Sequence, residues 1–145
     1  MARPFRLTAQ VVPEQIEAEH FMRWVRAHMA AHPELKLLYH IPNGWRALFR
    51  IQTVEQLQRA GVLPGIPDYC LPVARGGFHA LYIELKRADG GVVSDEQSIV
   101  QGWLVEYGNR AVTCSGWSAA VDAVLGYLAM AEMAAVRNCL AQESR

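Results

Sequence analysis

Residues Gly65–Lys86 read GIPDYCLPVARGGFHALYIELK and are the most informative segment of the chain about its architecture. It predicts two antiparallel strands, over residues 68–73 and 79–86, joined by a turn at Arg75-Gly76-Gly77. Because side chains alternate between the two faces of a strand, the second strand has an apolar face and a polar face. The apolar face carries Leu81, Ile83 and Leu85, and the polar face carries Tyr82, Glu84 and Lys86.

The turn also predicts the register of this hairpin. A turn centred on Gly76 places Asp68 directly across from Glu84, with Cβ atoms about 5 Å apart. Two opposed carboxylates repel each other unless a proton or a cation lies between them. Hard oxygen ligands suit Mg²⁺ or Mn²⁺ best. Lys86, on the same face, could deprotonate or position an attacking water, or contact a phosphate oxygen.

Each of these residues also has an ordinary structural explanation. Glu84 and Lys86 alone would form a surface ion pair worth about 0–1 kcal/mol. Asp68, directly after Pro67, would be a turn residue that accepts backbone hydrogen bonds. The combination of two carboxylates in register with a lysine on their face favours a metal site. A register error of one residue would remove that argument.

Helices and two further strands are predicted on both sides of the hairpin. Strands are expected over 37–41 and 110–114, and a short helix over 53–60 with Thr53 as its N-cap. Longer helices are expected after Pro13, after Ser94, and from Ser115 or Ser118. Their predicted buried faces are, in order, Ile16, Phe21, Trp24, Val25 and Met29; then Ile99, Val100, Trp103, Leu104 and Tyr107; then Trp117, Val121, Val124, Leu125 and Leu128. This order of elements predicts an α/β fold, a mixed sheet flanked by helices.

Length and composition fit one compact domain. The chain has 145 residues, of which 52% are hydrophobic and 19% are charged, so it can bury a core. No apolar run approaches the roughly 20 residues that span a bilayer, and the N-terminus does not resemble a signal peptide. The three cysteines lack metal-ligand spacing. We therefore expect a cytoplasmic protein without a membrane partner.

Net charge is zero, but its distribution is uneven. Between Lys36 and Arg87 the sequence has seven basic and three acidic residues. This surplus could meet a polyanion such as DNA. An ordinary mixed surface explains the same distribution equally well.

Asp68 followed by Glu84-Leu85-Lys86 resembles the PD-(D/E)XK nuclease signature. The surrounding sequence resembles the VRR-NUC family, and most closely its stand-alone phage and prophage members. The segments that carry this resemblance are Ile41-Pro42-Asn43-Gly44, 61–68, 71–79, Glu84-Leu85-Lys86 and Ser94-Asp95-Glu96-Gln97. It covers roughly residues 14–128.

The resemblance implies a restriction-endonuclease-like fold and divalent-metal hydrolysis of phosphodiester bonds. It implies a homodimer that acts on branched DNA such as four-way junctions. Asp68, Glu84 and the carbonyl of Leu85 would bind Mg²⁺ or Mn²⁺, and Lys86 would be the catalytic lysine. Gln97 would lie near the site, although Ser94-x-x-Gln97 is also a capping box.

The family also places a glutamate on the first helix. Glu17, one turn before Phe21, is the preferred candidate, and Glu14 is the alternative. An acidic residue near a helix N-terminus also has a purely structural explanation, because it interacts favourably with the helix dipole.

Four residues are predicted to contact nucleic acid: Asn43, Arg46, Arg50 and Arg75. Related sequences often read Asn-Gly-Gly where this chain has Asn43-Gly44-Trp45. Trp45 would stack on a splayed base or lie in the core or a dimer interface.

The sequence thus predicts an N-terminal arm over 1–13, a nuclease domain over 14–130 and a helical extension or tail over 131–145. The leading hypothesis is a metal-dependent endodeoxyribonuclease. Two alternatives stay open: a DNA-binding protein that selects branched structures without cutting them, and a small dimeric interaction module that binds a protein partner.

Overall fold

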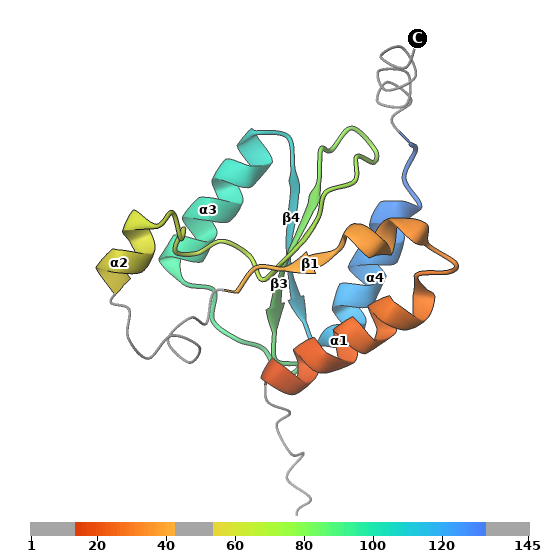
Figure 1. The fold of residues 1–145 in the computed structure, drawn as a ribbon, viewed down its shortest axis with the longest axis horizontal. Coiled ribbons are helices and arrows are strands. Elements are labelled where there is room, and N and C mark those ends of the chain that lie inside the picture. Colours follow the sequence, from red (N-terminus) through yellow and green to blue (C-terminus); the bar gives the residue numbers. More distant parts are fainter. Residues whose placement is uncertain (1–13, 43–53, 133–145) are drawn as a thin grey trace, which may run out of the picture.

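The computed structural model describes residues 14–42 and 54–132 (Figure 1). Its centre is a four-stranded sheet with the strand order β1-β2-β3-β4. The strands are β1 Tyr39–His40, β2 Tyr69–Leu71, β3 Leu81–Lys86 and β4 Arg110–Ser115. The β1–β2 and β2–β3 pairs are antiparallel and the β3–β4 pair is parallel, so the sheet is mixed, as predicted.

Helices lie on both sides of this sheet (Figure 1). The long helices are α1 Glu14–His28, α3 Asp95–Glu106 and α4 Trp117–Leu128, and the short ones are the 3-10 helix η1 Pro33–Leu37 and α2 Val54–Arg59. Helices α1 and α4 contact each other and β3, whereas α3 contacts β4. None of the helices in the described residues combines the length and the apolar character needed to cross a bilayer.

The core lies between β3 and the α1–α4 pair. The apolar face of β3, formed by Leu81, Ile83 and Leu85, is fully buried there. Phe21 on α1 meets the ring of Tyr69 on β2 edge to face, with centroids 5.1 Å apart. The predicted division of β3 into two faces is confirmed, because its other face carries the polar side chains described below.

The hairpin has the predicted register over shorter strands. Tyr69 pairs with Ile83 and Leu71 pairs with Leu81, which is the pairing that a turn centred on Gly76 requires. Strand β2 ends at Leu71 because Pro72 has no backbone N–H with which to continue the ladder. The predicted strand boundaries at 68–73 and 79–86 were therefore too wide.

The predicted strand over 37–41 is largely wrong. Pro33 starts a 3-10 helix that runs to Leu37, which leaves only Tyr39 and His40 in a strand. Proline favours the first position of a helix because its φ angle is already helical and its missing N–H would have no partner there.

Several predicted buried faces also need correction. On α3 only Val100 is buried, whereas Ile99 and Trp103 are each 52% exposed and Tyr107 is more exposed still. Among the described strands α3 contacts only β4. Most side chains of its predicted apolar face are therefore at least partly exposed to solvent. On α1, Ile16 is exposed.

The start of α4 is also corrected. Its N-cap is Gly116 rather than Ser115 or Ser118. Glycine has no side chain, so the N-cap residue itself provides no side-chain hydrogen bond to the helix. Trp117 and Leu125 are exposed by more than a third. Tyr127 is buried instead, and its hydroxyl donates to the carbonyl of Val73 at 2.6 Å.

Candidate active site

The polar face of β3 carries a buried carboxylate and a buried ammonium. Glu84 is 2% exposed and Lys86 is 9% exposed. Lys86 Nζ donates to Glu84 Oε1 at 2.7 Å and to Gln97 Oε1 at 3.2 Å. Gln97 Nε2 also donates to Glu84 Oε1. Three of the predicted site residues therefore form one hydrogen-bonded cluster between β3 and α3.

Asp68, the residue directly before β2, is hydrogen-bonded to the same strand, β3. Its Oδ2 accepts a hydrogen bond from the backbone N–H of Leu85 at 2.8 Å. Its carbonyl accepts from the N–H of Ile41 at 2.6 Å, directly after β1. Asp68 is thus held between β1 and β3, with its carboxylate at the position that the register predicts, next to Glu84.

Gln97 completes the predicted capping box and also lies next to Glu84 and Lys86. Its backbone N–H donates to Ser94 Oγ at 3.2 Å, and its Oε1 accepts from the Ser94 N–H at 3.0 Å, which is a complete capping box. The same side chain contacts Glu84 and Lys86. The cap therefore orients the amide toward the cluster.

Gly65 positions this end of α3 against the segment that leads to Asp68. It has φ +82°, and a Cβ atom there would lie 2.5 Å from the carbonyl carbon of Glu96. Only glycine permits both the left-handed backbone and the close approach. The Gly65-Ile66-Pro67-Asp68 segment thus packs directly on the first turn of α3.

Burial and the neighbouring negative charges disfavour the ionised form of Glu84. Burial raises the pKa of Glu84, and the negative charges of Asp68 and Glu14 raise it further, whereas Lys86 lowers it. Glu84 Oε2 is buried and has no hydrogen-bond partner in the described part of the chain. Buried carboxylate oxygens such as this one normally accept a hydrogen bond or bind a cation.

These residues fit a hard divalent cation. Oε2 of Glu84, the Asp68 carboxylate and the Leu85 carbonyl provide oxygen donors of the kind that Mg²⁺ and Mn²⁺ prefer. Among the described residues no group of three or more His, Cys, Asp or Glu side chains could hold a metal ion. A set of two carboxylates suits Mg²⁺, which usually keeps several waters.

The two candidate glutamates of α1 have different surroundings. Glu17 is buried, and its Oε2 accepts from the Trp117 N–H at 2.8 Å, so it caps the start of α4. Glu14 instead lines a cavity of about 280 Å³ together with Asp68, Leu85 and His40. Glu14, the alternative, thus shares a cavity with Asp68, whereas the preferred Glu17 bonds to the start of α4. Which of the two serves the site stays a prediction.

Of the predicted nucleic-acid contacts, Asn43, Arg46 and Arg50 lie outside the described residues, as does Trp45. The side chain of Arg75, the fourth predicted contact, is buried and paired. It bonds to Glu34 at 2.6 Å and lies 3.6 Å from Glu132. Both carboxylates are partly exposed, so the pair lies at the edge of the domain, and a phosphate contact by Arg75 stays a prediction.

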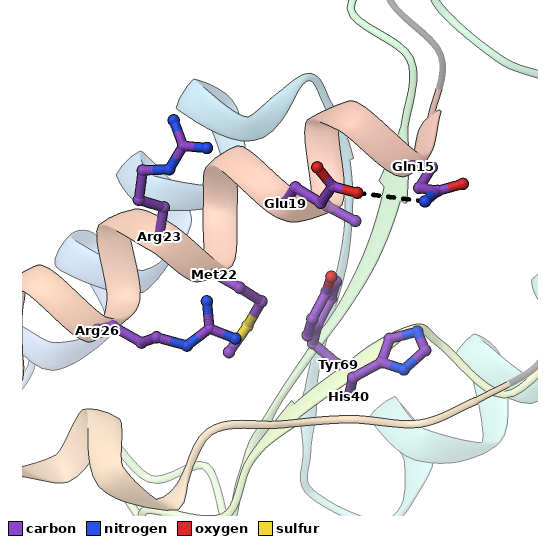
Figure 2. Close-up of a pocket in the computed structure, with 8 residues that line it drawn as sticks. Gln15, Glu19, Met22, Arg23, Arg26, His40 and Tyr69 are labelled. Atoms are coloured by element: carbon purple, nitrogen blue, oxygen red, sulfur yellow. Dashed lines mark hydrogen bonds between the residues drawn. The ribbon is translucent and has the colours of Figure 1, made fainter.

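A larger groove next to this cavity was not predicted. It has a volume of about 540 Å³ and lies between α1 and the β1–β2 edge (Figure 2). Its lining includes Arg23, Arg26, Glu19, His40 and Tyr69. The sequence does contain a signal for it, since Arg23 and Arg26 are three residues apart and share one exposed side of the first helix.

No protein-family model matches this sequence, and no curated protein matches it. Among solved structures, one described as a VRR_NUC domain protein superposes with a TM-score of 0.71. The match covers 85% of this chain and 93% of that chain, with 22% sequence identity. The chain therefore has the fold of that VRR_NUC domain protein, which confirms the predicted α/β, restriction-endonuclease-like architecture.

Proposed function

We propose that this chain is a VRR-NUC family nuclease that hydrolyses phosphodiester bonds in DNA with the help of a divalent metal. The observation that carries the proposal is the hydrogen-bonded cluster of Glu84, Lys86 and Gln97, with Asp68 bonded to the backbone of the same strand. Asp68, Glu84 and Lys86 are the residues that the PD-(D/E)XK signature assigns to catalysis. The shared fold with a VRR_NUC domain protein supports the proposal.

Asp68, Glu84 and the Leu85 carbonyl would hold Mg²⁺ or Mn²⁺. When bound, the cation supplies positive charge against the scissile phosphate and lowers the pKa of water. In the hydrolysis, a water oxygen bonds to phosphorus while the water gives up a proton to solvent, the bond from phosphorus to the leaving oxygen breaks, and that oxygen takes up a proton. No covalent enzyme intermediate is needed.

Lys86 and Gln97 have different parts in this proposal. The Lys86 ammonium, the buried cation of the cluster, would contact a phosphate oxygen or exchange a proton with the attacking water. Gln97 would act as a positioning residue, because its amide bonds to both Glu84 and Lys86. Glu14 would add negative charge at the mouth of the site, where it lines the cavity with Asp68.

Branched DNA is the proposed substrate class, and a homodimer is the proposed assembly. Both rest on the family resemblance. There is also a physical reason for both. A dimer with two symmetric sites can cut two strands of a symmetric junction, whereas one small domain cannot reach both strands at once.

The test is cleavage of a labelled panel: single strand, duplex, flap, splayed arm and four-way junction, each with Mg²⁺, Mn²⁺ or EDTA. The Asp68→Asn and Lys86→Met variants serve as controls, and circular dichroism verifies that both fold. Metal-dependent cutting by the wild type alone would support the nuclease. Tight junction binding without cutting would favour the DNA-binding alternative, and neither cutting nor binding would refute both.

A further inference from the structure

We propose that the groove along α1 is the track for the DNA backbone on one side of the active site, with Arg26 and Arg23 as its phosphate contacts. This inference rests on the proposed nuclease function and adds to it a binding surface outside the catalytic cluster.

The groove is continuous with the cavity of about 280 Å³ that Asp68 and Glu14 line. Four residues line both spaces: Gln15, Ala18, His40 and Tyr69. At one end the smaller cavity reaches Asp68 and Glu14, and at the other the groove reaches Arg23 and Arg26. A strand bound next to Asp68 can therefore continue along α1 without leaving the concave surface.

The side chains at the far end are suited to phosphate. Figure 2 shows Arg26 extending near Met22, toward Tyr69, whereas the end of the Arg23 side chain points away from Tyr69 and His40. Both arginines contribute to the lining of the groove. Both arginines are exposed, and neither forms an ion pair with any residue in the described part of the chain. The one acidic side chain of the groove, Glu19, accepts a hydrogen bond from Gln15 Nε2 at 3.2 Å.

Other described cations near the hairpin are already engaged. Arg75 is paired with Glu34, Lys86 with Glu84, and Arg87 with Asp89. The guanidinium of Arg110 lies over the ring of Phe78, 5.7 Å from its centroid. Arg23 and Arg26 are therefore the described cations that combine a place in the groove with freedom from an intramolecular partner.

Helix geometry sets the length of the track. Arg23 and Arg26 lie nine and twelve residues beyond Glu14 in α1, which corresponds to about 14 and 18 Å at ~1.5 Å per residue. A strand of B-form DNA advances about 3.4 Å per nucleotide. The two arginines would thus contact phosphates about four to five nucleotides from the scissile bond.

The experiment measures DNA binding without cutting, by fluorescence anisotropy of labelled duplex and four-way junction in EDTA. The Arg23→Gln, Arg26→Gln and double variants are compared with Arg59→Gln, which removes the same charge from exposed α2, on the other side of the sheet from α1 (Figure 1). We expect the double variant to bind at least about tenfold more weakly than Arg59→Gln. The plot of the logarithm of the association constant against the logarithm of the salt concentration has a negative slope, and this slope should become shallower by about 0.9 for each lost phosphate contact.

Substrate length provides a second readout. Shortening one DNA arm to about three nucleotides beyond the scissile bond should abolish the difference between wild type and the double variant.

The outcomes separate this inference from the proposed function. A wild type that cuts DNA, with the same affinity and salt slope in the double variant, would overturn the track and leave the nuclease intact. A wild type that binds through Arg23 and Arg26 without cutting would support the track and overturn the nuclease. An equal loss of affinity in Arg59→Gln would also overturn the track, because the effect would then be one of net charge.

Discussion

The carboxylate of Asp68 accepts a hydrogen bond from the backbone N–H of Leu85 at 2.8 Å, which ties the segment before β2 to the strand that carries Glu84 and Lys86. The contact uses one carboxylate oxygen of Asp68. The aspartate of the signature is therefore oriented by the same strand that carries its other two members, Glu84 and Lys86.

Asp68→Asn separates the charge of this residue from its hydrogen bond. The amide oxygen of asparagine can still accept from the Leu85 N–H, so we expect a melting temperature close to wild type. Cleavage should fall by about 10²-fold or more, because one anionic metal ligand is lost. Asp68→Ala removes charge and hydrogen bond together and should lose stability as well. Full cleavage by Asp68→Asn would contradict the assignment.

Addition of Mg²⁺ should stabilise the folded protein. At ten to a hundred times its Kd, a bound ion contributes about 1.4–2.7 kcal/mol of unfolding free energy. The melting temperature should rise more at pH 8 than at pH 5, because burial raises the pKa of Glu84 and the ion requires the deprotonated carboxylate. Differential scanning fluorimetry measures this, with Asp68→Asn as the variant in which the rise should be lost.

Lys86→Met should abolish cutting and change the pH dependence of stability. Lys86 lowers the pKa of Glu84, so its removal moves that pKa further above the unfolded value. The folded state then holds the proton more tightly than the unfolded state, so stability is gained as pH falls and lost as pH rises. We expect a loss of about 3 kcal/mol at pH 8 and much less at pH 5. Urea unfolding at the two pH values checks this; an equal loss at both would contradict it.

Glu17 and Glu14 provide a matched pair on one helix. Glu17→Ala removes the acceptor from the Trp117 N–H and should cost about 1–2 kcal/mol of stability. Its cleavage rate per folded molecule should be unchanged. Glu14 is exposed, so Glu14→Gln should keep wild-type stability and reduce cleavage. The reverse pattern, in thermal melts and single-turnover cleavage, would restore Glu17 to the site.

Gly65→Ala should be more disruptive than the same change at Gly61. Both glycines have positive φ, +82° and +94°, so both substitutions carry the backbone cost of about 1 kcal/mol. Only Gly65 has a neighbour within 4 Å of the added Cβ, the backbone of Glu96 at 2.5 Å. Gly65→Ala should therefore also displace Gln97 and lower cleavage. Equal stability and activity in the two variants would show that the contact is unimportant.

The hairpin was predictable because its signals are local. Strand alternation separates Leu85 from Glu84 and Lys86, and the Gly76-Gly77 turn determines which residues pair. The pairing of Tyr69 with Ile83 confirms that register. The capping box was equally local, since Ser94 and Gln97 are three residues apart.

The sequence gives no signal for contacts between residues that are distant in the chain. Nothing near Glu17 shows that it caps a helix 100 residues away, and nothing near Arg75 shows that it pairs with Glu34, 41 residues earlier. The apolar stripe of α3 has the correct helical spacing, but whether Ile99 and Trp103 are buried depends on what packs against them.

The hairpin, its register and the spacing of Asp68, Glu84 and Lys86 follow from local sequence, because backbone alternation and turn chemistry act over a few residues. The fold was needed to show which glutamate of α1 shares a cavity with Asp68, which described arginines have no ion-pair partner, and that a groove leads from this cavity to Arg26. These depend on the packing of α1 against the sheet, and packing brings together side chains whose sequence separation carries no local signal.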